Sequence, residues 1–192
     1  GEPVVSETPA CDGEVTYTYT YKDCAGHSHD WTYTYIIKHE DFTMPKDAGT
    51  TIACASELKV PTLPVVEDAC GNVLSPVGEP KVSETPACDG DVTYTYTYKD
   101  CAGHAHDWVY TYTIEHKDFT MPENDGTTIA CASELKAPTL PEVKDACGNV
   151  LSPVGEPKVS ETPVCDGKVT YTYTYKDCAG HAHDWVYTYT IE

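Results

Sequence analysis

Arginine is absent from this sequence: all 12 of its basic residues are lysines, and they are outnumbered by 31 aspartates and glutamates. An acidic surface of this kind repels phosphate backbones and anionic lipid headgroups, so the composition argues against nucleic-acid binding. No apolar run approaches the roughly 20 residues that a membrane-spanning helix needs. We therefore expect neither a nucleic-acid partner nor membrane insertion by this segment.

Helix signals are also scarce. The run "ASELK" at 55–59 is the one helix-like stretch, and Pro61 and Pro64 follow it so closely that it can form no more than a turn. The sequence therefore predicts a fold made of strands and turns.

Paired C-x-x-C motifs, which are typical of zinc sites, are missing although the chain has ten cysteines. The cysteines recur four to a period without drift, which favours disulfides over metal ligation. We expect an oxidising compartment, and hence a secreted or cell-surface protein.

One sequence motif recurs through the chain. "GEPVVSETPACDG" at Gly1 returns almost unchanged at Gly78 and Gly155, so one full period runs from each of these glycines to the next. The copies at 1–77 and 78–154 differ at only 13 positions, so one architecture is built repeatedly. Because no initiator methionine or signal peptide stands at residue 1, we expect a mature or internal piece of a longer chain with further copies of the repeat.

The period leaves the module boundaries open, because modules can begin at each "GEP" or near each "DFTMP". Lys38 and Glu40 of "KHEDFTMP" are replaced by Glu115 and Lys117 in "EHKDFTMP", and such an exchange of charges suits solvated linker positions. We therefore favour the second choice. It predicts a truncated module at 1–40 and complete modules at 41–117 and 118–192.

A tyrosine-rich hairpin is the strongest structural signal. Threonine and tyrosine alternate from Val92 to Tyr98 and again in Trp108–Ile114, with the turn sequence "KDCAGHAHD" between them. Alternation places the aromatic residues on one face of each strand and the threonines on the other. We expect the aromatic face to pack and the threonine face to be solvated.

Weaker strand signals lie at 50–56, 60–68 and 73–84, separated by glycine-containing turns. Several short strands at this spacing predict an all-β fold, namely tandem immunoglobulin-like antiparallel β-sandwich modules arranged as an extended rod. A module of a single period has a thin core, and disulfides are the usual supplement at this size.

Two motifs carry a family resemblance over the whole chain. "PVVEDACGNV" at 64–73, followed by "VTYTYTYKDCAGHAHDWVYTYTIE" at 92–115, is similar to the hyalin-repeat (HYR-like) module. The four-cysteine form resembles the tandem repeats of giant surface adhesins in gliding Bacteroidota. This resemblance implies an extracellular immunoglobulin-like sandwich used in tandem as the shaft of a long cell-surface protein. Cys101 departs from the general pattern, in which a cysteine is common in the last strand.

Four cysteines in a module allow three pairings. If the strands run as in an immunoglobulin sandwich, Cys70 and Cys101 lie at one pole and Cys54 and Cys88 near the other. This arrangement predicts the bridges Cys70–Cys101, Cys54–Cys88, Cys147–Cys178 and Cys131–Cys165, with Cys11 and Cys24 left without partners in this segment.

The hairpin turn could instead hold a metal. His104, His106 and Asp107 in one copy, and His181, His183 and Asp184 in the next, offer the donor atoms of a divalent-metal site. The alternative is a polar tip in which histidine caps the turn and aspartate accepts backbone hydrogen bonds. Acidic residues near the linkers also raise the prospect of Ca²⁺, although no D-x-D-x-D-G loop is present. No other cofactor is expected.

Catalysis needs a nucleophile with an adjacent base, or paired carboxylates in a cleft. Cys101 lies close to His104 in the sequence, but every cysteine recurs at a disulfide-like position and a small sandwich offers no evident substrate cleft. We expect no enzyme activity. The leading hypothesis is the shaft of an adhesin for gliding motility or surface attachment. The alternatives are a module that binds extracellular polysaccharide through its tyrosines and a subunit of an extracellular filament.

Overall fold

The computed structural model describes all 192 residues and consists of β-strands and two single-turn 3-10 helices, η1 (Ala55–Glu57) and η2 (Ala132–Glu134). The all-β prediction is confirmed, and the "ASELK" run forms only a turn, as expected. No helix has the length and apolar character needed to span a membrane.

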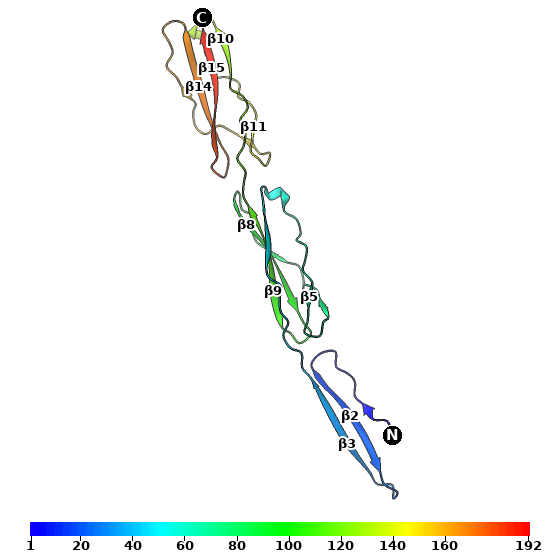
Figure 1. Cartoon of the computed structure of the whole chain (residues 1–192). Helices are drawn as coiled ribbons and strands as arrows, with labels where there is room; N and C mark the ends of the chain where they lie inside the picture. Colours follow the sequence, from blue (N-terminus) through cyan, green and yellow to red (C-terminus); the bar gives the residue numbers. More distant parts are fainter. The chain divides into compact units, whose positions relative to one another are not determined.

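Three long hairpins carry the tyrosine tracts (Figure 1). Each contains two ten-residue strands: β2 (Gly13–Lys22) with β3 (Ser28–Ile37), β8 (Gly90–Lys99) with β9 (Ala105–Ile114), and β14 (Gly167–Lys176) with β15 (Ala182–Ile191). Alternating threonine and tyrosine favour these strands because branched and aromatic side chains suit a pleated, half-buried surface. The predicted hairpin is therefore confirmed, with slightly longer strands.

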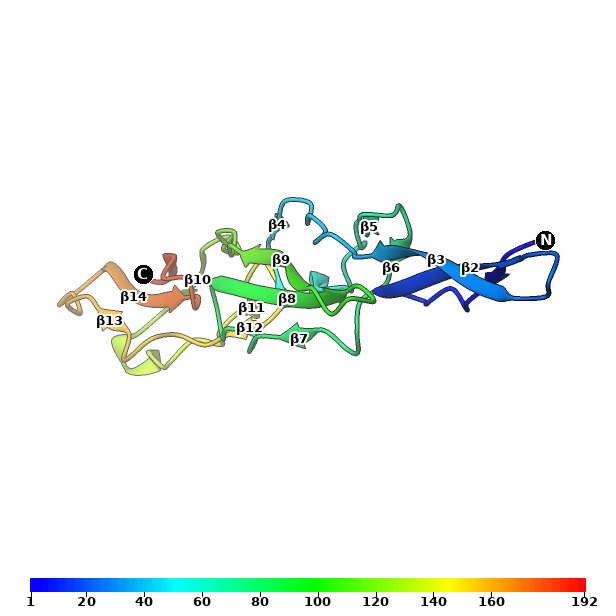
Figure 2. The same ribbon diagram turned by 90° about the horizontal axis from the view of Figure 1, so that it is seen from below.

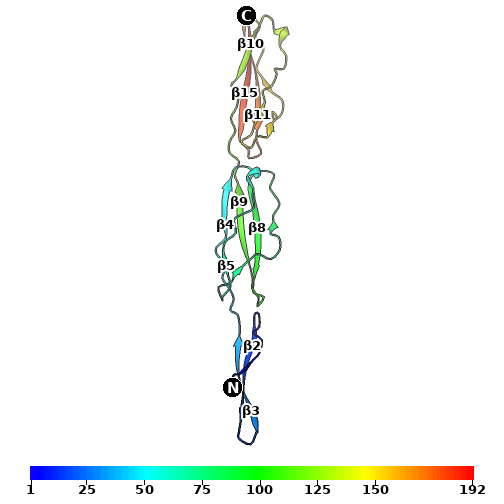
Figure 3. The same cartoon turned by 90° about the vertical axis from the view of Figure 1, so that its right-hand side faces the viewer.

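Short strands extend these hairpins into sheets. β4 (Ala48–Ile52) and β7 (Lys81–Val82) complete the order β4-β9-β8-β7, while β10 (Asp125–Ile129) and β13 (Lys158–Val159) complete β10-β15-β14-β13. β1 (Val4–Val5) lies beside β2. Figure 3 shows β10 beside β15, and this pair is parallel, in contrast to the antiparallel hairpins.

Two small antiparallel pairs form the opposing layer. β5 (Val66–Glu67) pairs with β6 (Val73–Leu74), and β11 (Val143–Lys144) pairs with β12 (Val150–Leu151). Figure 2 shows β5 and β6 as short arrows joined by a loop. These strands are much shorter than the predicted 60–68 and 73–84, because proline cannot donate a ladder hydrogen bond and the segments contain several prolines.

The core lies between these two layers. Val66 of β5 packs with Phe42 against the aromatic face of the β8–β9 hairpin, and Val143 packs with Phe119 against that of β14–β15. The hairpin side chains buried there are Tyr96, Tyr98, Trp108, Tyr173, Tyr175 and Trp185. The threonines of these hairpins are only partly buried, so the predicted division into a packed and a more solvated face is confirmed.

Contacts divide the chain into two units, each drawn from separate stretches. The first comprises residues 1–48, 61–82 and 93–110, and the second comprises 49–60, 83–92 and 111–192. The predicted module boundaries at 41 and 118 stay a prediction.

Candidate functional site

The turn of each long hairpin presents a cysteine on a fixed backbone. Asp100 is buried, and its Oδ1 accepts backbone N–H bonds of 2.8 Å from both Gly103 and His104. Its Oδ2 accepts a 2.6 Å bond from Nδ1 of His104. These bonds fix the turn that carries Cys101, and Asp177 makes the same three contacts next to Cys178. The predicted polar tip, with aspartate accepting backbone hydrogen bonds, is confirmed.

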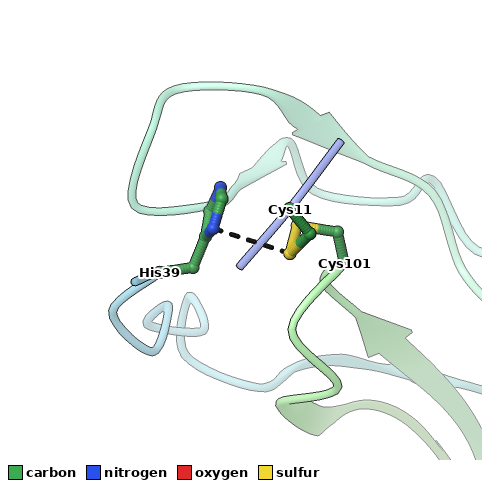
Figure 4. Close-up of side chains that lie close together, drawn as sticks. All are labelled: Cys11, His39 and Cys101. Carbon is green, nitrogen blue, oxygen red and sulfur yellow. Dashed lines mark hydrogen bonds between the residues drawn. A yellow bond between two sulfur atoms is a disulfide. The ribbon is translucent and has the colours of Figure 1, made fainter. Parts of the chain in front are cut away.

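A disulfide joins this turn to the preceding copy of the repeat. Cys101 is bonded to Cys11, with the Cα atoms 5.7 Å apart, and both residues lie in the first unit. Figure 4 shows the ring of His39 beside this bridge, with Nδ1 3.5 Å from Sγ of Cys11. The position of His39 is held by Asp12, whose Oδ1 accepts from the His39 backbone N–H at 2.7 Å and from Nδ1 at 3.0 Å.

The same arrangement recurs one period later in the second unit. Cys88 is bonded to Cys178, and Nδ1 of His116 lies 3.7 Å from Sγ of Cys88. Asp89 accepts from the backbone N–H and from Nδ1 of His116, both at 2.8 Å. Because the repeat reproduces these contacts, the bridge is a regular feature of the array.

A third disulfide joins Cys54 to Cys147 in the second unit, with Cα atoms 5.6 Å apart. Glu57 fixes one end, since its Oε1 accepts from the backbone N–H of Cys54 at 2.9 Å. Asp145 fixes the other, since its Oδ1 accepts from the backbone N–H of Cys147 at 2.9 Å. Cys54, Cys147 and His116 line one cavity of 190 Å³, so this bridge lies near Cys88–Cys178.

The predicted disulfide pairing is wrong. Cys70–Cys101, Cys54–Cys88, Cys147–Cys178 and Cys131–Cys165 are all absent, and each observed bridge links one copy of the repeat to the next. The cysteines Cys24, Cys70, Cys131 and Cys165 are free and exposed. Because each cysteine has a twin one full period away in nearly identical surroundings, the sequence pattern alone does not separate pairing within a copy from pairing between copies.

Histidine contacts shift the ionisation of the aspartates. The backbone and side-chain hydrogen bonds from His39 lower the pKa of Asp12, and those from His116 lower the pKa of Asp89. Burial opposes the ionisation of Asp100, but the hydrogen bonds from His104 and Gly103 outweigh it and lower the pKa. The Asp100 hydrogen bond raises the pKa of His104 in return.

The residues predicted as metal ligands do not converge on one point. His104 binds Asp100, Nε2 of His106 lies 2.8 Å from Oδ1 of Asp41, and Asp107 accepts from the Thr97 hydroxyl. Their counterparts His181, His183 and Asp184 likewise have three separate partners. These contacts tie the side chains to different parts of the fold.

Two other clusters have the donor types of a zinc site. Cys11, His39 and Cys101 place their ligand atoms within 4.8 Å of one another, as do Cys88, His116 and Cys178. Their sulfur atoms are bonded as disulfides, and a metal binds thiolates rather than a disulfide. The arrangement therefore serves as a covalent cross-link between copies.

Sequence reasoning missed Cys11 as a partner and missed the histidines beside the bridges. A signal for both was present, because "ACDG" and "KHED" or "EHKD" recur with every full period. Their proximity depends on the end of each hairpin meeting the loop at its beginning, which only the strand pairing reveals.

Comparison with known families matches nearly the whole chain. The description "HYR-like domain with 4 cysteines" fits residues 1–37, 42–114 and 119–191. The chain belongs to this family. The predicted HYR-like, four-cysteine tandem repeat is thereby confirmed. No curated protein matches this HYR-like chain.

Proposed function

We propose that these HYR-like repeats form the tension-bearing shaft of a secreted cell-surface adhesin that serves gliding motility or surface attachment. The role is mechanical and not enzymatic. Disulfides persist in oxidising surroundings outside the cytosol, which supports an extracellular location. Tandem copies of the repeat support a longer chain with more of the same modules.

The covalent path through the disulfides is the observation that carries this proposal. Tension applied to the chain ends passes from Cys11 to Cys101 through one bridge and from Cys88 to Cys178 through another. The route between the two bridges is the short segment from Cys88 to Cys101. Most of each repeat is therefore bypassed by the covalent path.

That segment has little slack. Strand β8 (Gly90–Lys99) supplies ten of its residues and is already extended at about 3.3 Å per residue. A fully stretched chain spans at most about 3.3–3.6 Å per residue, so pulling on this strand can lengthen it only slightly. Force along the array is thus carried by covalent bonds and by a strand that cannot lengthen much.

Single-molecule stretching between the two termini tests the proposal. In the oxidised chain the shortest covalent path contains about 40 residues, which limits the extension to roughly 140 Å. After reduction all 192 residues contribute, and the limit rises to roughly 650 Å. An oxidised chain that extends as far as the reduced chain would refute the mechanical role.

Two serine variants provide a matched pair. Cys88→Ser breaks the shortest path, and the remaining route through Cys54–Cys147 raises the limit to roughly 330 Å. Cys54→Ser removes a bridge that lies off the shortest path, so the extension should stay at the oxidised value. Equal behaviour of the two variants would contradict the proposed route of tension.

Polysaccharide binding through the tyrosines has little support. Tyr17, Tyr19, Trp31, Tyr33 and Tyr35 form an open aromatic cavity on the first hairpin. In the next copy the counterparts Trp108 and Tyr112 are only 3% and 2% exposed. A glycan platform of a repeating shaft would be exposed in every copy.

A further inference from the structure

Four cysteines remain exposed and unbonded in a chain that otherwise forms three regular bridges: Cys24, Cys70, Cys131 and Cys165. Exposed thiols are unusual in a disulfide-rich segment, because an oxidising compartment converts them to disulfides. Their positions in the repeat explain why they are free.

The observed bridges follow one rule. Cys11–Cys101 and Cys88–Cys178 are each separated by 90 residues, and Cys54–Cys147 by 93 residues. Applied to the free cysteines, the same separations place every partner outside residues 1–192. Cys24 and Cys70 require a preceding copy, which would supply the counterparts of Cys11 and Cys54. Cys131 and Cys165 require a following copy, which would supply the counterparts of Cys70 and Cys101.

The surroundings of Cys70 match those of its bonded twin. Oδ1 of Asp68 accepts from the backbone N–H of Cys70 at 2.9 Å, as Oδ1 of Asp145 does from Cys147. Cys70 thus already has the backbone that positions Cys147 for its bridge to Cys54.

Independent support comes from an uncovered aromatic face on the first hairpin. Trp31 is 53% exposed, whereas Trp108 is 3% exposed and donates its Nε1–H to the Lys46 carbonyl at 3.0 Å. Trp185 is covered in the same way and donates to the carbonyl of Glu123. In both covered copies the chain that precedes the hairpin supplies this cover, including Phe42 or Phe119. The face around Trp31 has the shape and chemistry that fit the same segment of a preceding copy.

We propose that two disulfides join every pair of consecutive copies in the repeat array. The four free cysteines then form disulfides with cysteines of neighbouring copies in the same chain. This inference goes beyond the mechanical role, since it concerns which sulfur atoms are bonded and does not depend on adhesion.

Each bridge forms by thiol–disulfide exchange. Two cysteine thiols lose two protons and two electrons, a small-molecule disulfide such as oxidised glutathione accepts them, and two small-molecule thiols leave through a mixed-disulfide intermediate. The oxidant is supplied by the extracellular compartment or by the refolding buffer.

Extension by one period tests the pairing. We would compare the present chain with a chain that carries one more copy of residues 1–77 before Gly1, both refolded in a glutathione redox buffer. Thiols are then blocked and bridges mapped by non-reducing peptide mass spectrometry. We expect the bridges to rise from three to five, with Cys24 and Cys70 bonded to the added counterparts of Cys11 and Cys54. Cys131 and Cys165 should stay blocked as thiols.

A second chain, extended after Glu192 by one period of the repeat, should show the converse: Cys131 and Cys165 become bonded while Cys24 and Cys70 stay free. If the extension leaves the expected pair free, or if Cys24 and Cys70 bond within their own copy, the proposal is overturned.

The burial of the aromatic face around Trp31 is measured separately. In the chain with the preceding copy, whose added counterpart of Trp31 is changed to phenylalanine so that it does not contribute to the signal, Trp31 should become as protected from acrylamide quenching as Trp108. Changing the added counterparts of Cys11 and Cys54 to serine should keep this protection while leaving Cys24 and Cys70 as thiols. Quenching of Trp31 that does not change on extension would refute the docking of the preceding segment, whatever the disulfide map shows.

Discussion

At the scale of single residues, polar side chains fix the loops and tyrosines fill the core. Asp145, Asp100 and Glu57 each accept backbone N–H bonds beside a bonded cysteine, so the bridges rest on turns that are already ordered. The tyrosine tract packs as core, and two of its members differ in one testable respect. Tyr175 has no hydrogen-bond partner for its buried hydroxyl, whereas Tyr189 donates to the Lys136 carbonyl at 3.0 Å.

Removing these two hydroxyls should have different effects on stability. Tyr175→Phe is expected to be neutral or to stabilise by up to about 1 kcal/mol, because it removes a buried polar atom without a partner. Tyr189→Phe should cost about 1 kcal/mol, because it leaves the Lys136 carbonyl without its donor. Urea denaturation of the two variants beside the parent chain measures both, and equal losses would show that Tyr175 has a partner after all.

The paired ionisations of the hairpin turn predict a pH dependence of stability. The pKa of His104 is raised above its ordinary value of 6.5, so its contribution is complete below pH 6.5 and is lost as the pH rises through the folded-state pKa. The pKa of Asp100 is lowered below 3.8, so its contribution is complete above pH 3.8 and is lost as the pH falls through the folded-state value. Between these limits the pair stabilises the turn fully.

Melting temperatures measured from pH 3 to 9 at constant ionic strength test this window. The double variant His104→Gln, His181→Gln should lose the decline on the alkaline side that His104 and its twin produce. A His29→Gln variant, which removes an exposed histidine of β3, controls for the loss of a titratable group. An unchanged alkaline decline in the double variant would contradict the prediction.

At the scale of elements, the hairpins could be predicted and their partners could not. Alternation in Val92–Tyr98 and Trp108–Ile114 predicted β8 and β9, because strand periodicity is a local property. The pairing of β4 with β9 instead joins segments that lie far apart in the sequence. Its sequence signal is a single small residue: a Cβ on Gly49 would lie 2.5 Å from the carbonyl oxygen of Thr111.

Gly49→Ala should therefore disrupt this edge of the sheet. We expect a loss of about 1–3 kcal/mol, because the added methyl group meets backbone that has to shift. Urea unfolding followed by tryptophan fluorescence measures the loss. Thr50→Ala, at the neighbouring exposed position of β4, is the control, and the prediction fails if the two variants unfold at the same urea concentration.

At the scale of the whole molecule, the disulfides link successive copies of the repeat instead of closing each copy on itself. The copy at 78–154 is bonded through disulfides to the copy before it and to the copy after it, so covalent continuity runs through the disulfides as well as through the backbone. The bridges close loops with sequence separations of 90, 93 and 90 residues, and loops of this length raise stability mainly by lowering the entropy of the unfolded chain.

The sequence by itself determined the period, the all-β class, the tyrosine hairpins and the HYR-like family, because composition, alternation and spacing are local or repeat along the chain. The predicted pairing of Cys70 with Cys101 and of Cys54 with Cys88 was wrong because it assumed that disulfides form only within one module. The tertiary structure decided that the turn of one hairpin meets the opening loop of the preceding one. Near-identical copies make the two pairings equivalent in sequence, and only the positions of the sulfur atoms in space distinguish them.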